Sequence, residues 1–241
     1  MSYDTLRRVA LEWGAIQQTR LRINNMMKAF KRLERPVYPW LDEITTQLER
    51  VEGVAFRDVR RNALSSSEPW IVRVAQFIEE THGLGPAVLC LVGLLPPLLN
   101  FANPAKVWKY VGLHVKSDGT APRKADAFDA EKMNPRTGKL GAPVFSPQLR
   151  SLATVRIVDP IIKQVESPYR IAYDARKAHT AVTHPEWATD NPKAPKMHYQ
   201  RDAIRYVAKR VLRDVWRAAH GHNVGDTHAP AAVPVRPEDA A

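Results

Sequence analysis

The stretch Phe77–Leu95, FIEETHGLGPAVLCLVGLL, decides the fold because it predicts two helices joined by a tight glycine turn. An apolar helical turn runs into Gly83-Leu84-Gly85-Pro86, and a second apolar helix starts at Ala87. Gly83 stands where a helix must end in a left-handed conformation, which costs a residue with a side chain about 1 kcal/mol or more. Pro86 suits the first turn of the following helix, since its missing amide hydrogen would have no partner there.

The same turn has the features of an anion site. Gly85 leaves the backbone bare, and the free amides at the start of the second helix point outward with the positive end of the helix dipole behind them. The pattern resembles the helix-hairpin-helix motif, which binds the nucleic-acid backbone without reading bases. An ordinary helical corner that binds nothing has the same sequence, so the two interpretations stay open at this point. We therefore predict Gly83 and Gly85 as nucleic-acid contacts on the strength of the rest of the chain.

The charge of the chain favours a polyanionic partner. Its 241 residues carry 36 Lys and Arg against 25 Asp and Glu, a formal net charge of +11. Nucleic acid is the commonest partner of a soluble protein with such a surplus. The single cysteine, Cys90, lies in an apolar run and suits a reducing compartment. The apolar run from Gly83 to Phe101 is broken by Pro96-Pro97 and falls short of the ~20 residues that a membrane helix needs. We expect a soluble cytoplasmic protein, prokaryotic or viral and associated with the nucleoid, without a membrane partner.

The first 51 residues show a heptad pattern. Apolar residues alternate steps of three and four, with one polar interruption at Arg20, and the stepping repeats after the prolines Pro36 and Pro39; the positions are Leu6, Val9, Trp13, Ile16, Ile23, Met27, Phe30, Val37, Leu41, Ile44, Leu48 and Val51. This pattern predicts a helical hairpin or coiled coil. A hairpin within one chain and a homodimer of two chains fit it equally. In either case Arg20 would set the register or pair with Glu43 or Glu49.

The remaining chain divides at its prolines and glycines. Residues 53–64 predict a linker or short helix, and Ser65-Ser66-Ser67-Glu68-Pro69 predicts the start of a helix. Residues 112–145 lose periodicity and predict a mobile basic arm that orders on nucleic acid, with Lys116, Arg123 and Lys124 as contacts. We expect an all-α fold with three parts: a helical arm and linker (1–64), a compact domain containing the helix-hairpin-helix (65–221), and a disordered tail (222–241).

The last helix, predicted from His198 to His220, has the clearest periodicity. An apolar stripe runs along one side, formed by Ile204, Val207, Val211, Leu212, Val215 and Trp216. Five bases follow each other at steps of four, namely Arg201, Arg205, Lys209, Arg213 and Arg217. Like charges at that spacing repel, so we predict one continuous positive ridge that a phosphate backbone neutralises. A solvated face tempered by Asp202 and Asp214 is the alternative.

Several pieces taken in order resemble a known family. GLGP at Gly83 is followed by NPAKVWKYVGL, SPQLRSLATVRI, SPYRIAYDARKA and HYQRDAIRYVAKRVLRDVW. Their order and spacing, over about two thirds of the chain, look like the carboxy-terminal half of the DEDD-type insertion-sequence transposases, relatives of the Piv-type DNA invertases and now called bridge recombinases. The resemblance implies DNA binding in recombination or transposition, with DNA and structured or guide RNA as partners. The amino-terminal heptads would match the coiled-coil linker that precedes this domain in the family.

The chain departs from that family at two places. Members carry a RuvC-like domain whose four acidic residues hold metal ions, and the residues before Glu68 have neither its strand pattern nor its acids. Members also use a serine, usually followed by glycine, that attacks DNA soon after a Gly-Leu pair. Here Ser117 is the nearest match after Gly112-Leu113, but Asp118 separates it from Gly119. A serine nucleophile needs a base or positive charge beside it, which Lys116 or His114 could supply. The resemblance thus makes Ser117 the candidate catalytic residue.

Other motifs add no cofactor. His220, His222 and His228 lack cysteine or acidic partners at ligand spacing, so we predict no metal site and no cofactor. Three functions stay open from the sequence: a DNA-binding module, a serine-dependent strand-transfer enzyme, and a helical oligomeric interaction protein.

Overall fold

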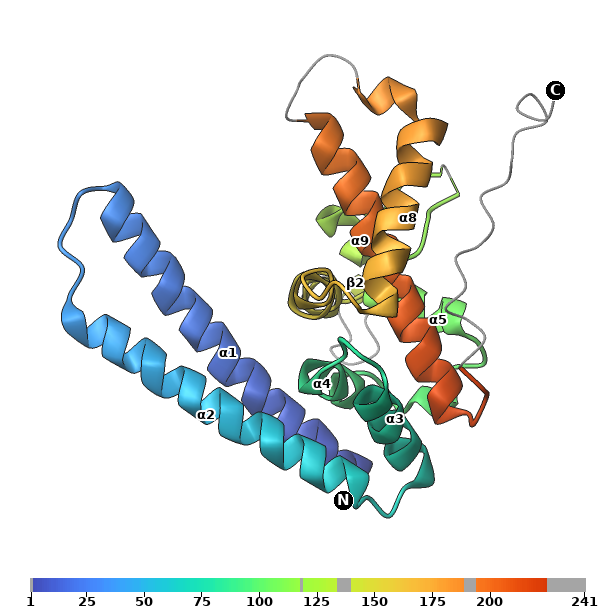
Figure 1. The fold of residues 1–241 in the computed structure, drawn as a ribbon, viewed down its shortest axis with the longest axis horizontal. Helices are drawn as coiled ribbons and strands as arrows, with labels where there is room; N and C mark the ends of the chain where they lie inside the picture. The colour runs from blue at the N-terminus through green and yellow to red at the C-terminus, as the bar shows by residue number, and fades with distance from the viewer. Residues whose placement is uncertain (1, 118, 134–139, 189–193, 225–241) are drawn as a thin grey trace. The chain divides into compact units, whose positions relative to one another are not determined.

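The computed structural model describes residues 2–117, 119–133, 140–188 and 194–224 (Figure 1). Its helices are α1 (Tyr3–Arg32), α2 (Pro39–Leu64), α3 (Pro69–Glu80), α4 (Pro86–Leu94), α5 (Pro104–Val111), α6 (Pro147–Ser151), α7 (Asp159–Ile161), α8 (Pro168–Thr183) and α9 (Ala194–Ala219). Shorter segments are the 3-10 turns η1 (Leu98–Asn100), η2 (Lys124–Ala127) and η4 (Pro185–Ala188) and the π-helical η3 (Leu152–Val158). The predicted all-α class is confirmed for the described residues, apart from two short strands, β1 (Phe128–Met133) and β2 (Leu140–Pro143).

The chain forms two compact units. Unit 1 contains residues 1–78 and 85–100, and unit 2 contains residues 79–84 and 101–241. The boundary that we predicted at residue 65 differs from this division, because most of α3 and all of α4 belong with the amino-terminal helices. The predicted tail lies almost wholly outside the described residues.

Unit 1 is built on a hairpin of α1 and α2, which run side by side (Figure 1). Ser2 caps α1 by accepting a hydrogen bond from the Thr5 amide, and Pro39 stands at the first position of α2. The heptad positions Leu6, Trp13 and Leu41 are buried. The heptads therefore serve a hairpin within the chain, and the homodimer remains a prediction without support from them.

A buried polar network joins the two helices. Arg20 donates to Glu52 at 2.9 Å and to Glu49 at 3.2 Å, and Gln17 donates to the other oxygen of Glu52 at 3.1 Å. The predicted pairing of Arg20 with Glu49 is confirmed, whereas the stronger partner, Glu52, was missed. Buried polar groups need all their partners, so this network admits one register between the helices.

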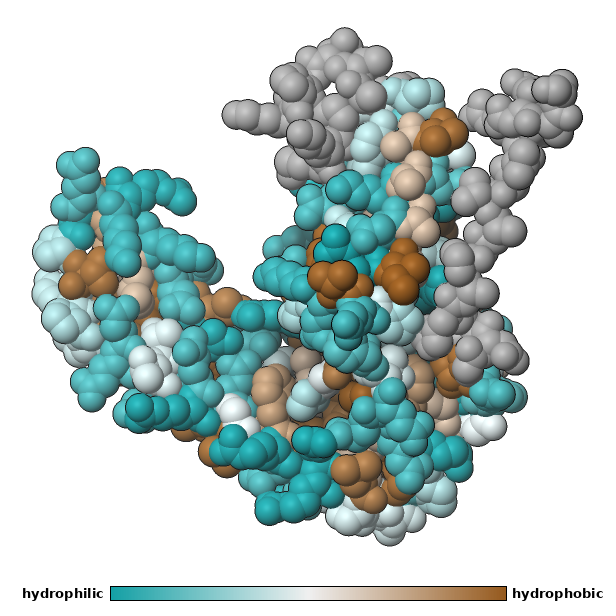
Figure 2. Space-filling view, viewed as in Figure 1, coloured by the Kyte–Doolittle hydropathy of each residue, from teal (hydrophilic) through white to brown (hydrophobic). Residues whose placement is uncertain are grey.

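The network also explains where the heptad prediction was wrong. Glu52 faces inward, and the predicted seam positions Ile44 and Val51 are left exposed. The helix continues to Leu64, so residues 53–64 are the second half of α2 and not a linker. Its buried positions there, Val59 and Ala63, continue the face that carries Glu52. Brown apolar patches are visible among the teal polar surface of unit 1 in Figure 2.

Helix α4 is apolar on all sides and packs against both α1 and α2. Close approach to α1 depends on Gly93, where an added Cβ would lie 2.8 Å from the Ala10 Cβ and 2.9 Å from the Leu6 carbonyl oxygen. Tyr3 at the start of α1 donates its hydroxyl to the Leu95 carbonyl after α4. Cys90 is buried, and burial raises the pKa of its thiol, with a smaller contribution from the charge of Glu52.

Unit 2 is arranged around α9, which contacts α5, η3, α8 and η4. The predicted stripe is confirmed at Val207, Val211, Leu212 and Val215, which are buried. Two indole hydrogen bonds hold α5 and the residues before it against α9. Trp216 of α9 donates to the carbonyl of Phe101, which precedes α5, at 2.8 Å, and Trp108 of α5 donates to the carbonyl of Lys209 in α9 at 3.0 Å. Helix α9 is therefore both the core of unit 2 and the carrier of the predicted ridge.

The prediction of a structureless arm over 112–145 was wrong for its described part. Strands β1 and β2 pair antiparallel, with Phe128 opposite Pro143 and Met133 opposite Leu140. The side chains of β1 are mostly exposed, so the strand lacks the alternation of buried and exposed positions that marks a half-buried strand. Residues 134–139, which include the basic residues Arg136 and Lys139, lie outside the described residues.

The Glu52 network generates a first prediction. Glu52→Ala removes the acceptor of Gln17 and the closer of the two acceptors of Arg20, and we expect it to lower the free energy of unfolding by about 3 kcal/mol. Glu49→Ala removes a half-exposed partner of the same arginine and should cost less than about 1 kcal/mol. Urea unfolding of both variants is the measurement. Equal losses would mean that the network does not fix the hairpin.

The α1–α4 contact generates a second prediction. Gly93→Ala should destabilise the protein by about 1–3 kcal/mol because the added methyl overlaps Ala10 and Leu6. Gly14→Ala is the matched control, since it lies within α1 with nothing within 4 Å of an added Cβ, and it should stabilise by about 0.5–1 kcal/mol. Thermal unfolding distinguishes the two. A neutral Gly93→Ala would show that the two backbones do not need this approach.

Candidate nucleic-acid interface

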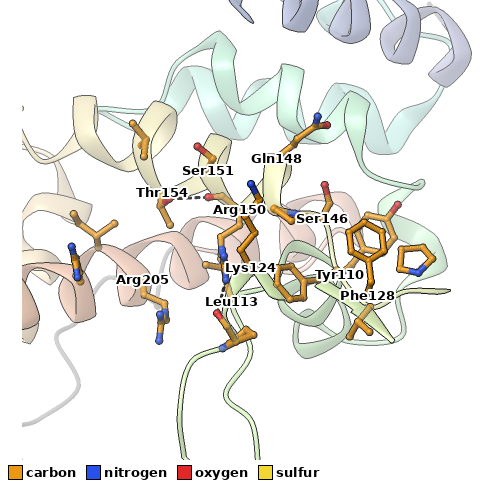
Figure 3. A pocket seen from close by; sticks show the side chains of 18 of the residues that line it. Tyr110, Leu113, Lys124, Phe128, Ser146, Gln148, Arg150, Ser151, Thr154 and Arg205 are labelled. Atoms are coloured by element: carbon orange, nitrogen blue, oxygen red, sulfur yellow. Dashed lines mark hydrogen bonds between the residues drawn. The ribbon is translucent and has the colours of Figure 1, made fainter. Parts of the chain in front are cut away.

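A cavity of about 1410 Å³ lies within unit 2. Its lining residues come from α5, from η2 and the β-hairpin, from the helical stretch that runs from α6 through η3 to α7, and from α9 (Figure 3). The segments are far apart in sequence and are held by local contacts: the Ser146 amide donates to the Tyr110 carbonyl at 3.1 Å, and the Val144 amide donates to the Ala127 carbonyl at 2.8 Å. The Phe145 ring packs on Gly112 at the end of α5. The cavity is therefore lined by residues from 110–159 together with residues from 201–205 of α9.

Four cationic side chains line this cavity: Lys124, Arg150, Arg201 and Arg205. Arg150 is anchored, because it donates to the Pro122 carbonyl at 2.7 Å and its guanidinium lies 4.9 Å from the Phe145 ring centroid. Lys124 and Arg201 are exposed, and Arg205 is half-buried. In Figure 3, Arg150 and Lys124 lie between Arg205 on one side and the aromatic Tyr110 and Phe128 on the other.

The charges of this cluster act on one another. Burial lowers the pKa of Arg205, and the positive charge of Arg150 lowers it further, while Asp202 opposes the change. An arginine stays charged at neutral pH, so the lowered pKa of Arg205 reflects mainly the cost of burying its charge, which Asp202 offsets in part. Burial and the charge of Arg205 likewise lower the pKa of Lys209. An anion in the cavity would offset the cost of burying Arg205 further.

Negative charge at the cavity is sparse and already paired. Asp159, the carboxylate in the lining, forms an ion pair with Lys163 at 3.4 Å. Asp202 on α9 accepts from Arg176 at 2.6 Å and from Thr180 at 2.9 Å, so its oxygens turn toward α8. The described lining thus presents four positive side chains against one paired carboxylate.

The pKa of His114 is also affected by the positive charges of unit 2. Burial lowers the pKa of His114, and the positive charges of Lys109, Lys209 and Arg150 lower it further, against a smaller opposite effect of Asp126. Its Nδ1 is buried, and no described residue forms a hydrogen bond with it. Burial first and these three cations second disfavour the charged form of the imidazole, so its neutral form is favoured at pH 7.

The predicted ridge is divided by the fold. Arg201 and Arg205 line the cavity. Lys209 lies 5.5 Å from the Trp108 ring centroid, and Arg213 donates to the buried Asp214 at 2.9 Å. Asp214 also accepts from the Tyr169 hydroxyl at 3.1 Å. Arg217 is half-buried and outside the cavity. The five bases are not one open face: two reach the cavity, and two already have partners inside unit 2.

The glycine corner is present, but its amides are partly used. Gly83 has a φ of 93°, so its predicted left-handed conformation is confirmed, although α3 ends three residues earlier at Glu80. An added Cβ at Gly83 would lie 2.5 Å from the Ser167 hydroxyl oxygen, so this side of the turn is covered within unit 2. The Leu84 amide donates to the Thr81 carbonyl, and the Val88 amide donates to the Gly85 carbonyl. Neither Gly83 nor Gly85 lines the cavity. The corner and the cavity are separate features.

The predicted bases of the former arm have different positions. Lys124 lines the cavity. Lys116 forms an ion pair with Asp126 at 3.5 Å, and the Arg123 amide donates to the same carboxylate at 2.6 Å. The Arg123 side chain is exposed outside the lining. Asp126 therefore holds the turn that presents Lys124.

Ser117 lies exposed in a turn closed by a hydrogen bond from the Gly119 amide to the Lys116 carbonyl. In the described ranges no hydrogen bond joins its hydroxyl to a base, and Lys116 is already paired with Asp126. Asp118 lies outside the described residues. The geometry thus gives the serine no activating partner from the described chain.

The sequence prediction missed Arg150 and the aromatic residues of the cavity. Arg150 stands on a short helix among apolar neighbours, and its sequence context matches that of any surface arginine. Only the fold brings it near Arg205, which is far away in the sequence. No local pattern could have predicted the pair.

Two further observations concern membranes and metals. None of the helices in the described ranges combines the length and apolarity that crossing a bilayer requires. In the same ranges, no cluster of three or more His, Cys, Asp or Glu side chains is placed to hold a metal ion. His220 and His222 lie near the Trp216 ring, with centroids 4.1 Å and 5.7 Å away, and His228 is outside the described residues.

No protein-family model, no curated protein and no solved structure gives a significant match to this chain. The resemblance to transposases consequently stays a prediction from the sequence.

The His114 environment generates a third prediction. Because its pKa is lower in the folded protein than in the unfolded chain, the unfolded chain binds a proton first as the pH falls below about 6.5. Stability should be full above that pH and decrease toward the lower folded pKa. His114→Asn should reduce this acid sensitivity, whereas the exposed His82→Asn should not. Unfolding free energies at several pH values test this, and an unchanged pH dependence in His114→Asn would contradict it.

Proposed function

We propose that the protein binds nucleic acid through the cationic cavity of unit 2. The observation that supports this most directly is the convergence of Lys124, Arg150, Arg201 and Arg205 on one cavity. Phosphate groups are the ligands that such clusters of arginine and lysine hold, Arg by two parallel hydrogen bonds and Lys by charge. Each phosphate bound would also relieve the repulsion between Arg150 and Arg205.

A polymer suits the cavity better than a small anion does. Its volume of about 1410 Å³ exceeds the roughly 300–1,000 Å³ of most small-molecule pockets. The cations are spread over three elements, η2, α6 and α9, so one small anion would leave some of them unneutralised. The net charge of +11 extends the attraction beyond the cavity. A phosphate backbone crossing the cavity accounts for all three features.

The biological setting of the proposal comes from the sequence. The order of motifs from Gly83 onward resembles the carboxy-terminal half of DEDD-type transposases, and we therefore propose a role in DNA recombination or transposition, with DNA as the first partner to test. Strand cleavage by Ser117 is left out of the proposal, because the described contacts give its hydroxyl no base.

A pair of arginine variants provides the fourth prediction. Arg201→Gln changes an exposed residue of the cavity and should weaken binding to a short DNA duplex or single strand several-fold. It should also reduce the slope of log affinity against log salt by about 1, since one phosphate contact is lost. Arg217→Gln changes the other end of the ridge and should leave both quantities unchanged. Fluorescence anisotropy across a salt series is the measurement.

The outcomes separate the cavity from the continuous ridge. Equal losses for Arg201→Gln and Arg217→Gln would favour the ridge that the sequence predicted. Wild-type affinity and salt slope in both Arg201→Gln and Arg150→Gln would overturn the proposed function. Ser117→Ala is the control for catalysis: binding should persist, and no covalent protein–DNA adduct should form in either the variant or the wild type.

A further inference from the structure

The cavity has a second wall whose chemistry differs from that of the cationic one. Tyr110 from α5 and Phe128 from β1 line it, and both are exposed, Phe128 at 60% and Tyr110 at 37% of the residue surface. Figure 3 places these two rings toward the end of the cavity opposite Arg205. Two further apolar residues of the lining, Val144 and Val155, are exposed as well. A folded chain gains stability by burying such rings, and exposed apolar groups that gather at one place often mark a binding site.

Local structure fixes the aromatic wall relative to the charged one. Lys124 and Phe128 are four residues apart on the same segment, whose turn is held by the contact between Asp126 and the Arg123 amide. Phe128 pairs with Pro143 across the hairpin, and the Tyr110 carbonyl accepts from the Ser146 amide just before α6, which carries Arg150. Each aromatic residue is thus tied by a few covalent or hydrogen-bonded steps to a cation of the cavity.

We propose that this cavity receives an unpaired nucleotide of a nucleic-acid strand, with its base against Phe128 and Tyr110 and its phosphates at Arg150, Arg201 and Arg205. The inference deepens the proposed function and rests on it. Base stacking on exposed aromatic side chains beside a positive groove is the general way in which proteins hold single strands. In a duplex the faces of each base are covered by its neighbours, so only an unpaired base can stack on these rings.

The aromatic wall adds a preference that the cations alone cannot provide. Arginine and lysine contacts to phosphate are the same whether or not a sugar carries a base. Stacking requires the base and tolerates any sequence, because every base has a π face. The site should therefore favour single strands over duplexes of equal charge, with little preference among bases.

The experiment compares two single strands of equal length and charge. One is an oligothymidylate, and the other carries abasic sugars at its central positions. Wild-type protein should bind the first about tenfold more tightly than the second, since stacking of one base on an aromatic ring contributes on that order. Phe128→Ala should remove this difference while keeping the salt slope, and Phe128→Tyr should retain it. Trp40→Ala, an exposed aromatic residue of unit 1, is the matched control and should behave as the wild type does.

The outcomes distinguish the inference from the proposed function. If the wild type binds both strands equally, or if Phe128→Ala still discriminates between them, the unpaired-nucleotide site is overturned. If neither strand is bound in a salt-dependent way that Arg201→Gln weakens, the proposed function itself fails. Circular dichroism of each variant shows whether it is folded, and Phe128→Tyr tests the site with the ring kept.

Discussion

The repulsion along α9 is the constraint on which unit 2 depends. Five positive side chains at steps of four share one side of a helix whose opposite side is the core of the unit. The fold resolves this by giving different cations different surroundings. The Trp108 ring faces Lys209, and Asp214 pairs with Arg213. The first two, Arg201 and Arg205, are left at a cavity in which the fold places Arg150 as a third arginine. Two cations of α9, Lys209 and Arg213, thus have partners within unit 2, whereas Arg201 and Arg205 lie at the cavity.

The acidic residues of α9 reinforce this asymmetry. Asp214 is fully buried against Tyr169 and Arg213, and Asp202 is turned toward Arg176 and Thr180 on α8. Both carboxylates therefore hold α9 to its neighbours, and Asp202 opposes the field of the cavity only in part. Burial is the main cause of the lowered pKa values of Arg205 and His114, and the positive charge of Arg150 adds to the effect at both residues. Proteins keep such unrelieved charge at binding sites more often than elsewhere.

The sequence predicted the features that depend on local patterns and missed those that depend on distant contacts. Helix starts marked by serines and prolines were predicted closely, and so was the apolar stripe of α9. The inward face of α2 was not, because burial of Glu52 with Arg20 overrides the preference of Ile44 and Val51 for the interior. The β-hairpin was missed because its strands are short and neither face of β1 is buried, so burial imposes no long periodic pattern on the sequence. Lys124, Arg201 and Arg205 were predicted from charge alone, while Arg150, Tyr110 and Phe128 join them only through tertiary structure.

The two walls of the cavity respond to different variables, and this separates their contributions. Attraction between phosphates and the arginine wall falls as salt rises, because it depends on released counterions. Stacking on the aromatic wall depends on the apolar ring surface that is removed from water, and moderate salt hardly changes it. A strand held by both walls would lose the charged contribution as salt increases, while its preference for a base over an abasic sugar would stay nearly constant. Cations arranged without the exposed rings would lose affinity with salt in the same way, but they would show no such preference at any salt concentration.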